Sequence, residues 1–215
     1  MPMDPASIDP KILAQQLRKP EGNLGEQVGE VMAKRHMQAM AFTFEHLHVK
    51  PTDHVLEIGF GPGEAIAEAA RLTPKGYVAG IDYSETMLRM AEKRNRRAIM
   101  QEHVALTLGD ARRLPYEDES FDVVFAMNVF HFWPVPLLEL AECRRVLKKG
   151  GHILFYLTHH SGWMEGLSDS GFFLKYESAD VEKILTDASF QKVESRSITI
   201  DDRKCFVVWG FKGKR

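Results

Sequence analysis

Short apolar runs alternate with amphipathic stretches along most of this chain. The apolar runs lie at residues 54–58, 77–82, 104–108, 121–127 and 152–158. Between them the sequence is typical of helices: an Ala-rich run from Glu64 to Leu72, a stretch after Ser84 to about Arg97, Leu137 to Leu147, and a segment from Ser178 to Ala188. Strands that alternate with helices favour a parallel sheet covered on both faces. The run at 121–127 is almost wholly apolar, as expected for a central strand.

The C-terminal part of the pattern differs. Residues 192–200 and 204–211 flank the polar turn Asp201-Asp202-Arg203, which predicts a hairpin. With this hairpin the predicted fold is α/β, a doubly wound Rossmann-like sheet of seven strands, mainly parallel, with an antiparallel C-terminal hairpin strand.

Prolines and a methionine-rich helical pattern distinguish the first fifty residues. Pro2, Pro5 and Pro10 predict an irregular arm, followed by a helical turn over 11–17 and a break at 18–22. Residues 26–47 then have helical periodicity, and this helix either packs on the core or covers a ligand as a lid. We therefore expect a helical cap, 1–50, packed on a ligand-binding domain, 51–215.

A glycine-rich turn follows the first predicted strand. Glu57 near the end of the strand precedes Gly59, Gly61 and Gly63, and a helix follows. Such a turn lets a ligand approach bare backbone at a helix N-terminus, although alone it can be only a tight connection. Asp82 ends the second strand, where nucleotide-binding folds place an acid on ribose hydroxyls. Together the two features indicate a nucleotide-like ligand.

Composition and charge narrow the function classes. The 215 residues carry 28 Lys and Arg against 30 Asp and Glu, so we expect no nucleic-acid partner. The N-terminus lacks a signal-peptide pattern and no run is long and apolar enough to insert in a membrane, which favours a cytoplasmic protein. Cys143 and Cys205 suggest neither a disulfide framework nor a cysteine-based metal site, and we predict no bound metal. Nothing indicates the oligomeric state.

Several motifs in order carry a family resemblance. They are Val55-Leu56-Glu57-Ile58-Gly59-Phe60-Gly61-Pro62-Gly63, Gly80-Ile81-Asp82-Tyr83-Ser84 with Met87, Gly109-Asp110-Ala111 with Leu114-Pro115-Tyr116, Ser120-Phe121-Asp122, and Arg145 to Gly151. This succession resembles the class I S-adenosylmethionine-dependent methyltransferases, in the branch that includes quinone-biosynthesis C-methyltransferases and bacterial small-molecule methyltransferases. Residues 18–32 also resemble a bacterial subgroup, with His36 where we expect Asn.

The resemblance implies that S-adenosyl-L-methionine is the cofactor and assigns its contacts. Gly59, Gly61 and Gly63 would face its methionine and ribose parts, and Glu57 its ammonium. Asp82 would accept hydrogen bonds from the ribose hydroxyls.

The remaining implied contacts come from later strand ends. Tyr83 and Met87 would flank the adenine, while Asp110 would accept from the adenine amino group and the Ala111 amide would donate to a ring nitrogen. Asn128 would help to hold the methionine end through its carbonyl. All these positions follow strands, where open α/β sheets bind ligands.

Methyl transfer is an in-line displacement that needs alignment and requires neither a metal nor a covalent enzyme intermediate. An acceptor that loses a proton requires a base, and histidine suits neutral pH. His131 is the first candidate, followed by His159 and His160, although each histidine can equally serve packing. Trp133, Trp163, Phe172 and Phe173 are candidates for an apolar pocket that binds a small-molecule acceptor.

Other functions fit less well. A nucleic-acid methyltransferase is disfavoured because Asn128-Val129-Phe130-His131 differs from the motif that holds a flipped base. Arsenite methylation would need more cysteines, and a nicotinamide oxidoreductase would need a different glycine spacing. A non-catalytic cofactor-binding module remains an alternative. The sequence does not identify the acceptor or the atom that is methylated.

Overall fold

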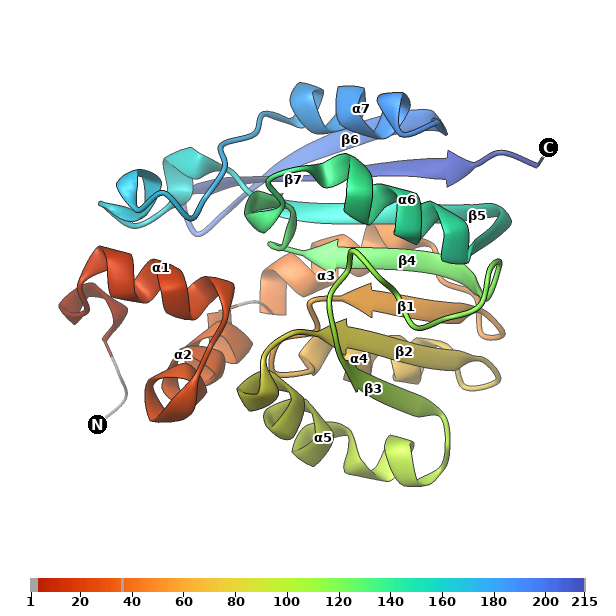
Figure 1. Ribbon diagram of the computed structural model, residues 1–215, viewed down its shortest axis with the longest axis horizontal. Coiled ribbons are helices and arrows are strands. Elements are labelled where there is room, and N and C mark those ends of the chain that lie inside the picture. The colour runs from red at the N-terminus through yellow and green to blue at the C-terminus, as the bar shows by residue number, and fades with distance from the viewer. Residues whose placement is uncertain (1–3, 36, 215) are drawn as a thin grey trace.

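A seven-stranded sheet forms the centre of the molecule, and the computed structural model describes residues 4–35 and 37–214 (Figure 1). Its strands are β1 (His54–Ile58), β2 (Tyr77–Asp82), β3 (Val104–Leu108), β4 (Phe121–Met127), β5 (Leu147–Thr158), β6 (Phe190–Ile200) and β7 (Arg203–Lys212). Their order is β3-β2-β1-β4-β5-β7-β6. Strands β1 to β5 are parallel to one another, and β7 is antiparallel to both of its neighbours, β5 and β6. The predicted fold class is confirmed.

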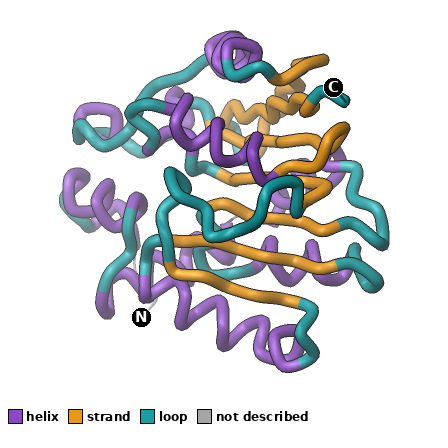
Figure 2. Tube along the Cα trace, turned by 45° about the vertical axis from the view of Figure 1, so that its right-hand side comes forward, coloured by secondary structure: helices purple, strands orange, loops and turns teal. Residues whose placement is uncertain are grey.

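The helices are α1 (Pro10–Arg18), α2 (Gly22–Arg35), α3 (Met37–Leu47), α4 (Glu64–Leu72), α5 (Glu85–Met100), α6 (Pro136–Val146) and α7 (Ser178–Asp187). Short 3-10 turns lie at η1 (Pro5–Ser7), η2 (Phe130–Phe132), η3 (His160–Gly162) and η4 (Leu167–Asp169). Figure 2 shows helices on both sides of the sheet.

Alternate residues of each central strand enter opposite layers of the core. Leu56 and Val124 pack with α6 and α7, whereas Val55 and Val123 pack with α3, α4 and α5. All four side chains are fully buried. Because both faces of the sheet are covered, the carboxyl ends of the strands are the place left for a ligand.

Three local predictions differ from the structure. The helix predicted over 26–47 begins earlier, at Gly22, and the described residues 22–35 and 37–47 are helical, while His36 lies outside the described residues. Strand β5 begins at Leu147 instead of 152, because Gly150 takes a positive φ of 78° and lets the bulged segment pair with β4. Helix α7 is capped by Glu177, in a capping box with Asp180, and Ser178 is already helical.

The first two helices lie beside the arrowheads of β1 and β2 in Figure 1, at the carboxyl ends of the parallel strands. Leu13 and Ala14 of α1 and Val28 of α2 form a small core with Leu167 of η4. The N-terminal segment therefore packs against the loop that follows β5. Among the described residues, no helix is long and apolar enough to cross a membrane.

Candidate active site

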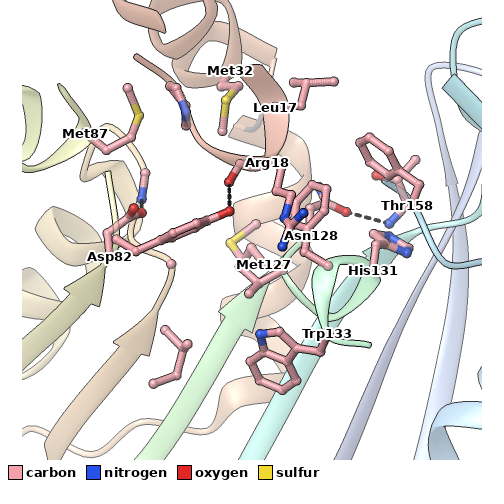
Figure 3. A pocket seen from close by; sticks show the side chains of 18 of the residues that line it. Leu17, Arg18, Met32, Asp82, Met87, Met127, Asn128, His131, Trp133 and Thr158 are labelled. Carbon is pink, nitrogen blue, oxygen red and sulfur yellow. Dashed lines mark hydrogen bonds between the residues drawn. The ribbon is translucent and has the colours of Figure 1, made fainter. Parts of the chain in front are cut away.

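A cavity of about 310 Å³ opens at the carboxyl ends of β1, β2 and β4. Figure 3 shows side chains from its walls, which come from separate parts of the chain. Asp82 and Asn128 follow strands, Leu17 and Met32 come from α1 and α2, and Trp163 comes from the segment after β5. A site at the strand ends agrees with the behaviour of open α/β sheets.

The glycine turn and Asp82 form one hydrogen-bonded unit. Gly59 and Gly61 have φ of 71° and 51° and both line the cavity. The Asp82 carboxylate accepts from the Gly61 amide and from the Ser84 amide, each at 2.9 Å. Asp82 thus orients the turn as well as facing the cavity, where its carboxylate oxygens are available to a hydroxyl donor.

Gly63 has a different role from the other two glycines. A Cβ at this position would lie 2.7 Å from the Ala91 Cβ and 2.9 Å from the Ala91 Cα, both on α5. Gly63 does not line the cavity, so its small size serves the packing of α4 against α5.

Two acids are buried at this end of the sheet. Burial raises the pKa of the Asp82 carboxyl, and backbone amides of Ser84 and Gly61 counteract this effect. Glu57 is only 2% exposed, and its Oε2 has no hydrogen-bond partner among the described residues. Burial, and then the nearby Asp82, raises the pKa of Glu57 well above its usual range. A buried carboxylate oxygen without a partner fits a cationic or donating ligand group, but Glu57 itself does not line the cavity.

The two residues predicted to flank the adenine lie on one side of the cavity. Met87 is fully buried and contributes to the cavity wall. Tyr83 is 40% exposed, and its hydroxyl donates to the Arg18 carbonyl. This hydrogen bond joins the end of α1 to the β2 strand end.

Asp110 and Ala111 also line the cavity, but Asp110 has a neighbour that the sequence did not indicate. The Arg112 guanidinium donates to both carboxylate oxygens, with Nη2 2.5 Å from Oδ2. Arg112 also lowers the pKa of Asp110. An adenine amino group would share this carboxylate with Arg112.

Asn128 fixes the end of β4. Its φ is 55°, a left-handed conformation that Asn tolerates, and its Oδ1 accepts from the Thr158 amide at 2.8 Å. The Asn128 amide donates to the Tyr156 carbonyl at 2.8 Å. Asn128 thereby joins the ends of β4 and β5 at the cavity wall.

His131 is a buried, uncharged histidine in the cavity wall. It is 2% exposed, and burial lowers its pKa to about 4, although the Leu174 and Thr158 backbones act in the opposite direction. Its Nδ1 lies 3.3 Å from the Leu174 carbonyl, while Nε2 has no hydrogen-bond partner among the described residues. The geometry favours the tautomer with the proton on Nδ1 and the lone pair on Nε2.

The aromatic residues near His131 form one side of the cavity. The Trp163 ring meets His131 edge to face, with ring centroids 5.0 Å apart, and the centroid of Phe173 is 4.9 Å from that of Trp163. Trp133 also lines the cavity, whereas Phe172 packs with the small N-terminal core.

His159 and His160 lie outside the cavity lining. The Nε2 of His159 is 2.8 Å from Glu177 Oε1, and its Nδ1 is 2.8 Å from Ser161 Oγ. The structure thus brings His131 together with the cofactor-side residues but not His159. The catalytic role predicted for His159 remains a prediction without a cavity contact.

Several cavity residues had no sequence signal of their own. Leu13 and Leu17 are separated by one helical turn, which predicts an apolar face but not its partner. Glu139 of α6 is 3% exposed, lines the cavity and has an Oε2 without a partner among the described residues. Arg112 and Arg203 add cationic groups at the rim.

Comparison with known proteins agrees with this geometry. Residues 56–155 match the family described as "Methyltransferase domain". Residues 56–155 of this chain therefore form a methyltransferase domain. The match supports the predicted methyltransferase family, and together with the methyltransferase structures described below it supports S-adenosyl-L-methionine as the cofactor.

Curated relatives share the domain but not the full length. A demethylmenaquinone methyltransferase from Alkalihalophilus pseudofirmus is 35% identical over 122 residues, which cover 56% of this chain and 51% of the relative. One from Lactobacillus johnsonii is 38% identical over 111 residues, 51% of this chain and 46% of the relative. The chain spans about half the length of these curated relatives.

Solved structures share the fold at low identity. A S-adenosylmethionine-dependent methyltransferase from Aquifex aeolicus superposes with a TM-score of 0.69 and 21% identity, over 95% of this chain and 99% of the other. A phosphoethanolamine N-methyltransferase from Haemonchus contortus, in complex with S-adenosyl-L-methionine, has a TM-score of 0.75 and 16% identity, over 96% and 60%. Both similarities establish the fold.

Proposed function

We propose that this chain transfers a methyl group from S-adenosyl-L-methionine to a small, largely apolar acceptor, and that His131 takes up the proton which the acceptor loses. The observation that carries the proposal is the shared cavity. Cofactor-side groups such as Asp82 and the Gly59–Gly61 turn line the same space as the buried His131 and its aromatic neighbours.

The residues present fit the cofactor. Two cavity-lining glycines leave bare backbone for close approach, and the buried Glu57 carboxyl lies beneath them without a partner for its Oε2. Asp82, Tyr83, Met87, Asp110, Ala111 and Asn128 would complete the contacts. When bound, the cofactor supplies an electrophilic methyl group on a sulfonium.

The protein's own contribution is alignment, exclusion of water and proton uptake. The low pKa keeps His131 uncharged at neutral pH, and the Leu174 carbonyl favours the proton on Nδ1. The Nε2 lone pair is then available to an acceptor hydroxyl or acidic C–H. Trp163 and Phe173 shield this atom and favour an apolar acceptor body.

We further propose that residues 1–50 act as a cap over the domain formed by 51–215. Leu13, Leu17, Val28 and Met32 line the cavity. The segment is attached to the strand ends by the Tyr83 hydroxyl, which donates to the Arg18 carbonyl, and by the Ser84 hydroxyl, which donates to the Pro20 carbonyl at 2.5 Å. These contacts support closure of the acceptor side by the N-terminal helices.

A panel of acceptors tests the proposal. The protein is incubated with S-adenosyl-L-methionine and phenols, naphthoquinols, thiols or amines, and products are detected as a mass increase of one methyl together with S-adenosylhomocysteine. The naphthoquinols are included because curated relatives are demethylmenaquinone methyltransferases. Calorimetric binding of S-adenosylhomocysteine without turnover of any acceptor would favour the non-catalytic module, and binding of NAD instead would contradict the assignment.

A His131→Gln variant tests the base. For acceptors that lose a proton, kcat should fall by roughly 10²–10⁴. A thiol acceptor that is already ionised should be turned over at an almost unchanged rate. His48→Asn, at an exposed histidine that does not line the cavity, serves as the control, and an equal loss in both variants would argue against a base at His131.

A further inference from the structure

A second cluster of chemically active side chains lies outside the cavity wall. His159, His160 and Glu177 are the one group of three or more His, Cys, Asp and Glu residues, within the described part of the chain, whose donor atoms all lie within 4.8 Å of one another. The two histidines follow β5, and Glu177 caps α7. The cluster therefore joins two segments that are separated in the sequence.

The donor distances suit a metal ion after small side-chain movements. Glu177 Oε1 is 2.8 Å from His159 Nε2 and 3.9 Å from His160 Nδ1. Ligands about 2.1 Å from a tetrahedral zinc ion lie roughly 3.4 Å from one another, which is between these two values. The His160 Nδ1 atom is buried and has no hydrogen-bond partner among the described residues. An unsatisfied buried donor or acceptor calls for a ligand.

A supporting hydrogen bond is already in place. His159 Nδ1 lies 2.8 Å from the Ser161 hydroxyl oxygen. Nδ1 now accepts from the Ser161 amide at 3.2 Å, so the proton is on Nε2. When Nε2 binds a metal it gives up this proton, and Nδ1 becomes protonated and donates to Ser161 Oγ in place of accepting from the amide. Metal-ligating histidines commonly donate their second N–H in this way.

The position of the cluster gives it a structural consequence. The segment between His160 and Glu177 carries Trp163, Met164, Leu167 and Phe173, all of which line the cavity. We propose that His159, His160 and Glu177 bind a divalent transition-metal ion, zinc best by its preference for two imidazoles and a carboxylate, and that this ion ties together the two ends of the segment. The prediction of no bound metal rested on the two cysteines, since no spacing pattern in the sequence links His159 and His160 to Glu177.

Calorimetry with zinc chloride tests the proposal on protein that carries no histidine tag and has been treated with a chelator. We expect one ion per chain, and affinity reduced about tenfold or more in His160→Asn and Glu177→Gln. His48→Asn is the matched control, since His48 is exposed and Asn tolerates its φ of 49°. This variant should bind zinc like the wild type.

The proposal is overturned if the wild type gives no heat of binding with excess zinc, or if all four proteins bind equally. Circular dichroism in chelator verifies that the variants are folded. Glu177→Gln decides the outcome if a histidine variant is unfolded, because the amide oxygen preserves an acceptor at the start of α7. The assay needs no cofactor or acceptor, so its result is independent of the proposed methyl transfer.

Limited proteolysis tests the structural consequence. Lys175 is exposed within the segment and is a trypsin site. Zinc should slow cleavage after Lys175 several-fold in the wild type and in His48→Asn, but not in Glu177→Gln. Equal protection in Glu177→Gln would show that zinc acts elsewhere.

Discussion

Asp82 combines two tasks in one side chain. Its carboxylate accepts hydrogen bonds from the amides of Gly61 and Ser84, and so fixes the turn and the start of α5. The same side chain lines the cavity. Sequence reasoning identified the residue from its position at a strand end but not the hydrogen bonds that tie it to the turn. A substitution of Asp82 should therefore reduce both the stability of the protein and its affinity for the ligand.

In Asp82→Asn one of the two amides would face an NH₂ group and lose its acceptor. A hydrogen bond to a charged group contributes about 1.5–3 kcal/mol. We expect a loss of about this size in the free energy of unfolding, measured with denaturant, and weaker binding of S-adenosylhomocysteine by calorimetry. Asp187→Asn is the control, because its ion pair with Lys183 is exposed and should contribute less than about 1 kcal/mol. Equal effects in both variants would contradict the assignment.

His131 should make stability depend on pH. Its pKa is about 4 in the folded protein and about 6.5 when unfolded, so the unfolded state binds the additional proton between these values. Stability is therefore full above pH 6.5 and falls as the pH drops toward 4, by up to about 3 kcal/mol. Between pH 7.5 and pH 5 the free energy of unfolding in urea should fall less in His131→Gln than in the wild type. If the free energy of unfolding fell equally in both proteins, the buried His131 would not be the cause of the pH dependence.

At the scale of elements, the glycine turn is the most constrained connection. Gly63 has φ of 87° and faces backbone and side-chain atoms of α5, whereas Gly22, with φ of 61°, has no atom within 4 Å of an added Cβ. A substitution at Gly22 therefore measures backbone strain alone, whereas one at Gly63 measures backbone strain together with a packing clash.

Gly22→Ala should cost about 1–2 kcal/mol from the left-handed conformation alone. Gly63→Ala should cost that amount and a further 1–3 kcal/mol, roughly, because the Ala91 backbone cannot yield without moving α5. Denaturant unfolding of the two variants gives the comparison. A Gly63→Ala protein no less stable than Gly22→Ala would contradict tight packing at the turn.

Elements were predictable where local sequence decides them. The strands at 54–58, 77–82, 104–108 and 121–127 have the predicted bounds. Each is a short apolar run with turn or polar residues at both ends, so the local sequence marks where the strand begins and ends. The start of β5 was missed since it depends on pairing with β4 and on the φ of Gly150. Ser189, which directly follows the C-cap of α7, takes a left-handed φ of 65°.

At the scale of the molecule, distant segments meet at the strand ends. The strand-end residues of the candidate site were predictable because parallel strands present their carboxyl ends along one edge. The contributions of Leu17, Met32, Arg112 and Glu139 were not, since only tertiary packing brings α1, α2 and α6 to the cavity. Likewise, the pairing of His159 with Glu177 joins segments that no spacing rule connects.

Tyr83→Phe should loosen the N-terminal segment. The Tyr83 hydroxyl donates to the Arg18 carbonyl, and a hydrogen bond contributes about 1 kcal/mol. Local opening should then increase roughly fivefold, and trypsin should cleave after Arg18 correspondingly faster. Tyr176→Phe, at a half-buried tyrosine near α7, is the control. Unchanged cleavage in Tyr83→Phe would mean that other contacts hold this segment.

The origin of the cavity walls has a consequence for how acceptor choice can diversify. One side consists of the strand-end residues, and the opposite side comes from α1, α2 and the 160–174 segment, which pack on each other through Leu13, Val28 and Leu167. Exchange of both segments together with those of a related enzyme should produce chimeras that accept a different molecule. The strand-end residues that contact the cofactor would be unchanged in such chimeras. Exchange of either segment alone would place side chains that do not fit each other at the contact between Leu13, Val28 and Leu167.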